Sequence, residues 1–181
     1  MPSVISHAAV AVAAGVAFAP REVPNHFWPL SLVCSTIADA DIIAFSFGIP
    51  YLHLFGHRGF FHSPFFGLLT SILFICLFFR DIEIFSKRWC FYFVFFFLLS
   101  ASHGIFDAFT NGGLGIALLA PFDNTRYFFS WRPIVVSPIS IGGFFSKWGL
   151  AVIKSELLWV WLPSFIIVVV SKLIRFILVR Q

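Results

Sequence analysis

The sequence predicts an all-α protein, a polytopic membrane helical bundle of about five transmembrane helices. Composition is the first reason, because 60% of the 181 residues are hydrophobic and only 11% are charged, whereas about a quarter of the residues in a soluble domain are charged. The aromatic content is the second reason, since 20% of the residues are aromatic and 27 are phenylalanine. The third is a series of apolar stretches close to the roughly 17–25 residues that a helix needs to cross a bilayer.

Five apolar stretches provide the predicted spans, so residues 1–181 are predicted to form a single integral-membrane domain. In chain order they are Val4–Ala19, Phe27–Gly48, Pro64–Phe79, Trp89–Phe109 and Leu157–Val179. The first is rich in alanine and glycine, which suits close packing between helices. It also resembles a signal peptide, because Ala17-Phe18-Ala19 looks like a cleavage site. The lack of a basic residue before it and the following Pro20 favour a membrane helix instead.

The basic residues predict the orientation of the bundle. With five spans, loops 48–63 and 110–156 lie on the same side as the N-terminus. That side carries five basic residues: Arg58, Arg126, Arg132, Lys147 and Lys154. The opposite side carries seven: Arg21, Arg80, Lys87, Arg88, Lys172, Arg175 and Arg180. Because cytoplasmic loops carry the excess of Lys and Arg, we expect the opposite side, with Gln181, to be cytoplasmic.

The net charge of +4 does not indicate nucleic-acid binding. The basic residues are scattered at the ends of spans and form no stripe of the kind that contacts a phosphate backbone. The three cysteines, Cys34, Cys76 and Cys90, lie in or beside apolar spans without CxxC spacing. They are therefore predicted to be small hydrophobic residues, neither a disulfide framework nor a metal knot.

Ionisable side chains gather on the N-terminal side of the predicted topology. Four histidines and three aspartates approach this side from the spans or lie in its loop: His7, Asp39, Asp41, His57, His62, His103 and Asp107. Ionisable residues within a bilayer are costly and usually mark function. Mixed imidazole and carboxylate ligands suit zinc, manganese or iron better than calcium, so the predicted cofactor is a divalent metal, zinc first.

The spacing of these residues is compatible with metal binding. His103 and Asp107 are four residues apart and share a helix face. Asp39 and Asp41 are two apart and point to nearly opposite faces of a regular helix, so either the helix breaks there or only one of them binds directly. Each signal also has a simpler explanation, because His7 alone suits a packing residue and the two aspartates suit helix caps.

Several segments resemble the YdjM-like family of bacterial inner-membrane, metal-dependent hydrolases. They are "ISHAAVAVAAG", "ADAD", "GHRGFFHSPF" and "SHGIFDAFTNGGLGIALLAPFDNTRYFFSWRPIVVSPIS", and they span about residues 5–140 in order. The family is distantly similar to zinc-dependent phospholipase C. The resemblance implies that six residues are metal ligands: His7, Asp39, His57, His62, His103 and Asp107. It implies that Asp41 is a ligand or a partner of one, although Ala38 replaces the family's usual proline.

The resemblance also implies a metal-dependent hydrolase embedded in the bacterial inner membrane. We expect the substrate to be a phosphoester of a lipid or a nucleotide at the membrane surface. Asp39 or Asp41 would accept a proton, and Arg58 lies within the metal-binding loop itself. Arg126 and Arg132 would contact substrate phosphate or anchor an interfacial segment. The competing hypotheses are a metal or proton transporter and a membrane scaffold stabilised by metal.

Overall fold

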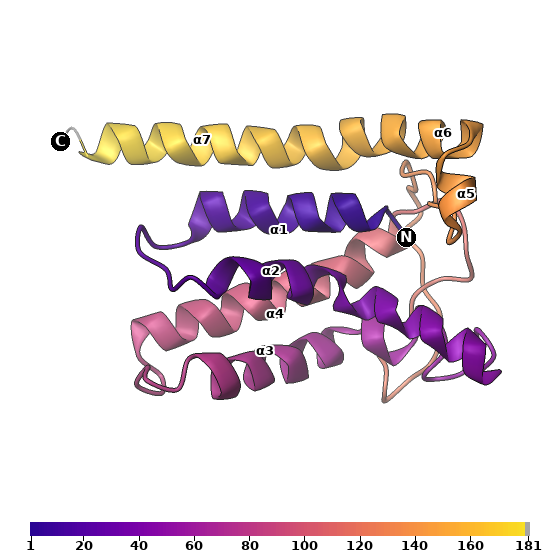
Figure 1. The fold of residues 1–181 in the computed structure, drawn as a ribbon, viewed down its shortest axis with the longest axis horizontal. Coiled ribbons are helices and arrows are strands. Elements are labelled where there is room, and N and C mark those ends of the chain that lie inside the picture. Colours follow the sequence, from indigo (N-terminus) through magenta and orange to yellow (C-terminus); the bar gives the residue numbers. More distant parts are fainter. Residues whose placement is uncertain (180–181) are drawn as a thin grey trace.

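The computed structural model describes residues 1–179, and its regular elements are all helical (Figure 1). Four α-helices cross most of the bundle: α1 (Val4–Phe18), α2 (Phe27–Thr36), α3 (Pro64–Phe78) and α4 (Lys87–Ala108). Three more follow a long irregular segment: α5 (Ile141–Phe144), α6 (Lys147–Glu156) and α7 (Leu162–Val179). Two 3-10 segments, η1 (Ile37–Phe47) and η2 (Phe60–His62), and a π-helical turn, η3 (Leu157–Trp161), complete the set. The all-α fold class is confirmed.

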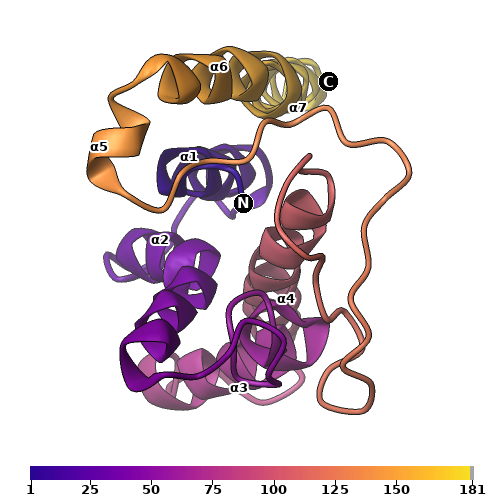
Figure 2. The ribbon, with the colours of Figure 1, turned by 90° about the vertical axis from the view of Figure 1, so that its right-hand side faces the viewer.

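The helices form a bundle in which α1 packs against α2 and α7, and α4 packs against α2 and α3. Viewed along the bundle, α6 and α7 lie above α1, and the segment after α4 passes outside α4 before returning to α5 (Figure 2). Phe27, Tyr92 and Phe96 are fully buried at the centre of an aromatic core. This core holds α2, α3 and α4 together by apolar contacts.

All five predicted spans coincide with apolar helices. Within residues 1–179, three helical stretches are long and apolar enough to cross a membrane: Phe27–Phe47, Lys87–Ala108 and Lys147–Leu178. The other two, α1 and α3, are apolar but have 15 residues each. At 1.5 Å per residue such a helix is about 22 Å long, less than the roughly 30 Å of the hydrocarbon core.

The boundary predicted for the last span is wrong. The sequence prediction placed residues 110–156 in a loop, whereas Lys147–Glu156 is helical and continues through the π-helical turn into α7. Ser146 caps this helix by accepting a hydrogen bond from the backbone N–H of Trp148. The charged residues Lys147, Lys154 and Glu156 interrupt the apolar pattern, so hydropathy alone does not predict this helix.

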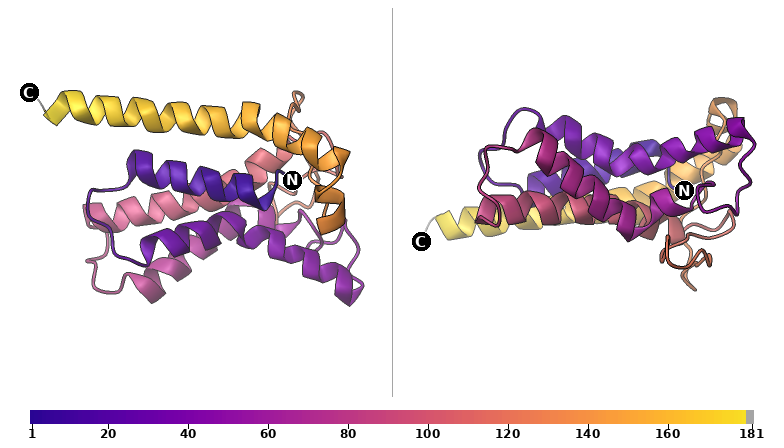
Figure 3. Two further views of the ribbon diagram at one scale, coloured as in Figure 1. Left: turned by 45° about the horizontal axis from the view of Figure 1, so that its top comes forward. Right: turned by 90° about the horizontal axis from the view of Figure 1, so that it is seen from below.

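The two ends of the bundle differ in what they carry. The N-terminus, η1 and α5 lie at one end, and the C-terminal end of α7 lies at the other, together with the α3–α4 connection (Figures 1 and 3). The loop 48–63 shares the end that contains η1 and α5. Gln181, predicted to be cytoplasmic, falls outside the described residues.

We predict that Leu52 faces the periplasm and Glu83, in the α3–α4 connection, faces the cytoplasm. Both side chains are exposed, so Leu52→Cys and Glu83→Cys can be labelled separately after the native cysteines are replaced. A membrane-impermeant maleimide should label position 52 in spheroplasts and position 83 only after permeabilisation. Labelling of both from one side would contradict the arrangement of spans, and exchange of the two sides would reverse only the orientation.

Candidate metal centre

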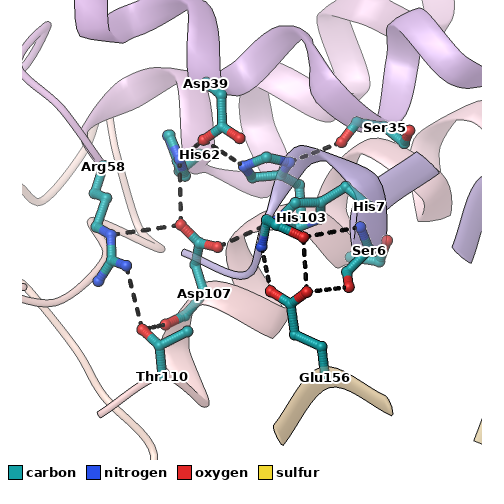
Figure 4. A network of polar contacts seen from close by, with 12 residues as sticks. Ser6, His7, Ser35, Asp39, Arg58, His62, His103, Asp107, Thr110 and Glu156 are labelled. Atoms are coloured by element: carbon teal, nitrogen blue, oxygen red, sulfur yellow. Dashed lines mark hydrogen bonds and ion pairs between the residues drawn. The ribbon is translucent and has the colours of Figure 1, made fainter. Parts of the chain in front are cut away.

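The seven predicted histidines and aspartates are all buried and lie together at the N-terminal end of the bundle. Figure 4 shows His7, Asp39, His62, His103 and Asp107 with neighbouring polar residues such as Arg58 and Glu156. Two overlapping groups have potential ligand atoms that lie within 4.8 Å of one another, and all their members are buried. The larger contains Asp39, His62, His103 and Asp107, and the smaller contains Asp41, His57 and His62. His62 therefore joins the two groups.

The larger group, which we call the central group, points its nitrogen and oxygen atoms at a common space. His103 Nε2 lies 3.2 Å from Asp39 Oδ1, and His62 Nε2 lies 3.6 Å from the same oxygen. His62 Nε2 is also 3.4 Å from Asp107 Oδ2. His62 Nε2, both Asp107 carboxylate oxygens and Asp39 Oδ2 are buried without a hydrogen-bond partner. Buried polar atoms of this kind are rare and need an explanation.

His7 stands beside the central group. Its ring stacks on that of His103 at a centroid distance of 3.8 Å. Its Nε2 lies 3.5 Å from Asp107 Oδ1 and has no hydrogen-bond partner. His7, predicted to be a ligand, therefore lies beside the central group and contacts Asp107 of that group.

Atoms behind the central group fix the orientation of its histidines. His103 Nδ1 lies 2.7 Å from the carbonyl oxygen of Ser35, near the end of α2. A carbonyl can only accept, so Nδ1 carries the proton and Nε2 presents its lone pair to Asp39 and the centre. This is the arrangement that commonly holds a metal-binding histidine.

Asp41 has the corresponding role for His62 and His57, because its carboxylate contacts the Nδ1 atoms of both rings. One oxygen lies 2.6 Å from His57 Nδ1, and the other accepts from the backbone N–H of Arg58 at 2.9 Å. That second oxygen is also 3.0 Å from His62 Nδ1. Both Asp41 oxygens are thus engaged with His57, His62 and the backbone of Arg58. His57 meets the central group through His62, whose ring lies edge-on to its own at a centroid distance of 5.6 Å.

A change in helical winding lets both aspartates reach the site. The segment Ile37–Phe47 winds as a 3-10 helix directly after α2. Residues two apart are separated by about 160° around an α-helix but by about 120° around a 3-10 helix. The helix therefore does not break at Asp39 and Asp41, and its tighter winding brings both aspartates to the site.

His62 lies at the junction of a tightly packed loop and α3. A side chain at Gly104 would collide with the carbonyl oxygen of His62, so only glycine permits this approach of α4. Burial lowers the pKa of His62, but the contacts and charges of Asp107, Asp39 and Asp41 outweigh burial and raise it well above its usual range. The carboxylates thus favour positive charge at this point.

Arg58 is fully buried next to Asp107. Its Nε lies 3.4 Å from Asp107 Oδ2. Nη1 donates to the carbonyl of Gly112 at 2.8 Å, and Nη2 donates to Thr110 Oγ1 at 3.2 Å. Arg58 therefore balances the charge of Asp107 and ties its loop to the segment after α4.

The two other predicted arginines do not reach the centre. Arg126 donates to the backbone carbonyls of His57, Tyr51 and His53 at 3.0–3.2 Å. Arg132 is exposed and lies over the ring of Phe128 at 4.7 Å. Arg126 thus holds the loop in shape, while Arg132 is placed like an interfacial residue.

Sequence reasoning missed Glu156, which is 2% exposed at the end of α6. Its carboxylate accepts from the backbone N–H and hydroxyl of Ser3 and from the hydroxyl of Ser6, the neighbour of His7. Trp161 Nε1 donates to the same Ser6 oxygen at 2.8 Å. A lone carboxylate at the start of an apolar span was the available signal, because such a group needs partners.

We predict that Glu156→Gln lowers the free energy of unfolding by about 1.5–3 kcal/mol, because an amide cannot accept at both positions and loses the charge. Glu83→Gln, in the exposed α3–α4 connection, is the control and should have little effect. Thermal unfolding of the detergent-solubilised protein, followed by circular dichroism, measures both. Equal stability of Glu156→Gln and the wild type would contradict the role of this network.

This chain is similar in sequence to known proteins over nearly its full length. A sequence model of the family described as YdjM inner membrane protein matches residues 1–179. Inner membrane protein YbcI of Escherichia coli (strain K12) is 35% identical over 174 residues, which cover 92% of this chain and 95% of YbcI. No solved structure matches the chain, so the distant similarity to zinc-dependent phospholipase C stays a prediction. The chain therefore belongs to the YdjM inner membrane protein family.

Proposed function

We propose that this inner membrane protein is a metal-dependent hydrolase that cleaves a phosphoester at the membrane surface. The observation that carries the proposal is the central group of two imidazoles and two carboxylates, buried with ligand atoms unsatisfied. Charged atoms in that state are costly, and a divalent cation would satisfy them together.

The spacing of the central group suits a tetrahedral cation. Zinc binds nitrogen and oxygen at about 2.0–2.2 Å, so neighbouring ligands of a tetrahedral site lie about 3.3–3.6 Å apart. The three measured separations among His62, His103, Asp39 and Asp107 are 3.2, 3.4 and 3.6 Å. These four residues would hold the ion. Zinc is the first candidate, and manganese or iron also accept this donor set.

A pocket lies beside His57 and Arg58, and we call it the polar pocket because it also contains Tyr51, Ser137 and Ser140. Its volume is about 410 Å³, and its lining includes Tyr51, His57, Arg58 and Gly113. A bound divalent cation would supply Lewis-acid polarisation of a phosphoryl oxygen. Arg58, whose charge is balanced by Asp107, lines the pocket and would offer guanidinium N–H groups to an anionic substrate. Burial raises the pKa of Tyr51 to about 12, so its hydroxyl remains a hydrogen-bond donor at neutral pH.

His57 is the side chain placed to exchange a proton in this pocket. Asp41 holds its Nδ1 at 2.6 Å, which leaves Nε2 for a bound molecule. The sequence suggested Asp39 or Asp41 as the proton acceptor. In the proposed mechanism Asp41 acts through His57, and Asp39 belongs to the central group.

The arrangement supports a hydrolase over a transporter. The polar groups stand at one end, whereas aromatic side chains such as Phe27, Tyr92 and Phe96 fill the other half of the bundle. An ion crossing the described part of the chain would meet this apolar core. The polar pocket supports a hydrolase over a scaffold, because a purely stabilising site needs no space for a substrate.

We predict that His103→Ala and Asp107→Asn each reduce the amount of bound metal. The double variant should bind about as much metal as the single variant that binds less. Metal analysis of purified protein by inductively coupled plasma mass spectrometry gives the stoichiometry. His53→Ala is the matched control, because this imidazole is exposed and outside both groups. Stoichiometric metal in the double variant would refute the site.

We predict that the metal-loaded protein hydrolyses members of a panel of phosphomonoesters and phosphodiesters, including bis(p-nitrophenyl) phosphate. Asp107→Asn should lower the rate by about 100-fold or more, since the residue belongs to the group that holds the ion. Glu83→Gln should leave the rate unchanged. Failure of the loaded protein on the whole panel would contradict the proposal, and metal flux into proteoliposomes would establish the transporter instead.

A further inference from the structure

Residues 137–140 line two pockets at the end of the bundle that carries the metal-binding groups. One is the polar pocket, whose lining includes Arg58 and His57. The other, which we call the apolar pocket, has a volume of about 460 Å³ and includes Asp39 of the central group. Met1 and residues 137–140 line both. An extended molecule laid across residues 137–140 would therefore have one part in each pocket, near Arg58 and near Asp39.

The lining of the apolar pocket indicates what it accepts. Apart from Asp39 and three serines, its lining is apolar and includes Val4, Ile5, Ile42 and Phe144. A nucleobase placed there would lose water without finding partners for most of its N–H and C=O groups. A hydrocarbon chain has no N–H or C=O groups to leave unpaired, and its transfer out of water is favourable.

The surroundings of the apolar pocket connect it to the bilayer. Val4 and Ile5 begin the first membrane helix and are 50% and 52% exposed. Ile141 and Phe145 of the short helix α5 are 79% and 84% exposed at the same end of the bundle. Large exposed apolar side chains beside a span lie in lipid or at its interface. A chain can thus enter the pocket directly from the membrane.

We propose that the substrate is a membrane lipid phosphoester, with an acyl chain in the apolar pocket and its phosphate on the Arg58 side of the centre. This inference rests on the proposed hydrolase function and selects the lipid over the nucleotide. The two pockets match the two parts of such a molecule, because one presents a buried guanidinium and the other apolar side chains.

Photocrosslinking tests the acyl-chain site without requiring activity. The probe is a phosphatidic acid with a diazirine in one acyl chain, incorporated in phosphatidylcholine vesicles that contain the full chain. Crosslinked peptides should concentrate on the segments containing Ile42 and Phe144. Ile42→Trp should reduce this crosslinking at least tenfold, and Phe144→Trp provides a second variant if the first does not fold. Leu73→Trp, at a 53% exposed position of α3, is the control for a lipid-facing tryptophan.

Crosslinks spread evenly over the lipid-facing helices, or unchanged in both pocket variants, would overturn the inference. Hydrolysis assays test the lipid inference separately from the proposed hydrolase function. The rate ratio of a long-chain lipid phosphoester to bis(p-nitrophenyl) phosphate should fall at least tenfold in Ile42→Trp. Hydrolysis of the soluble ester or a dinucleotide, with no preference for the lipid in the wild type, would refute the lipid inference and leave the hydrolase intact. Pocket crosslinking without any hydrolysis would refute the hydrolase.

Discussion

The burial of charge at one end of an apolar bundle is the constraint on which the rest of the structure depends. None of the seven histidines and aspartates in the two groups or beside them is more than 7% exposed. Groups removed from water in this way must satisfy one another or bind a cation. The tighter winding of η1, the close approach of α4 at Gly104 and the buried guanidinium of Arg58 all place partners beside these groups. Each is a local departure from regular geometry that serves the same requirement.

The two halves of the bundle have different structural roles. Aromatic side chains such as Phe27 and Phe96 pack one half without exposing polar atoms, and they fix the relative positions of α2 and α4. These two helices carry Ser35 and His103, whose contact orients an imidazole in the other half. The packing of the apolar half therefore helps to set the geometry of the polar half.

The sequence predicted the fold class, the spans and the side chains that meet, because apolar runs and isolated ionisable residues are visible in one dimension. It could not tell which group each aspartate joins, since the contacts of Asp39 with His103 and of Asp41 with His57 are visible only in space. It left substrate binding and interfacial anchoring open for Arg126, and it did not predict the contacts of this residue with loop carbonyls. It also missed Glu156, whose partners lie 150 and 153 residues away. Such long-range contacts leave no periodic trace in the sequence.

The contact between Glu156 and the first helix has a consequence for biogenesis. Ser3 and Ser6 are synthesised about 150 residues before their carboxylate partner. Until Glu156 has been made and its helix has inserted, the segment that carries His7 lacks the contact that holds it in place. The centre is thus completed only after α6 has been translated, and a chain cut before α6 would carry all seven histidines and aspartates without this contact.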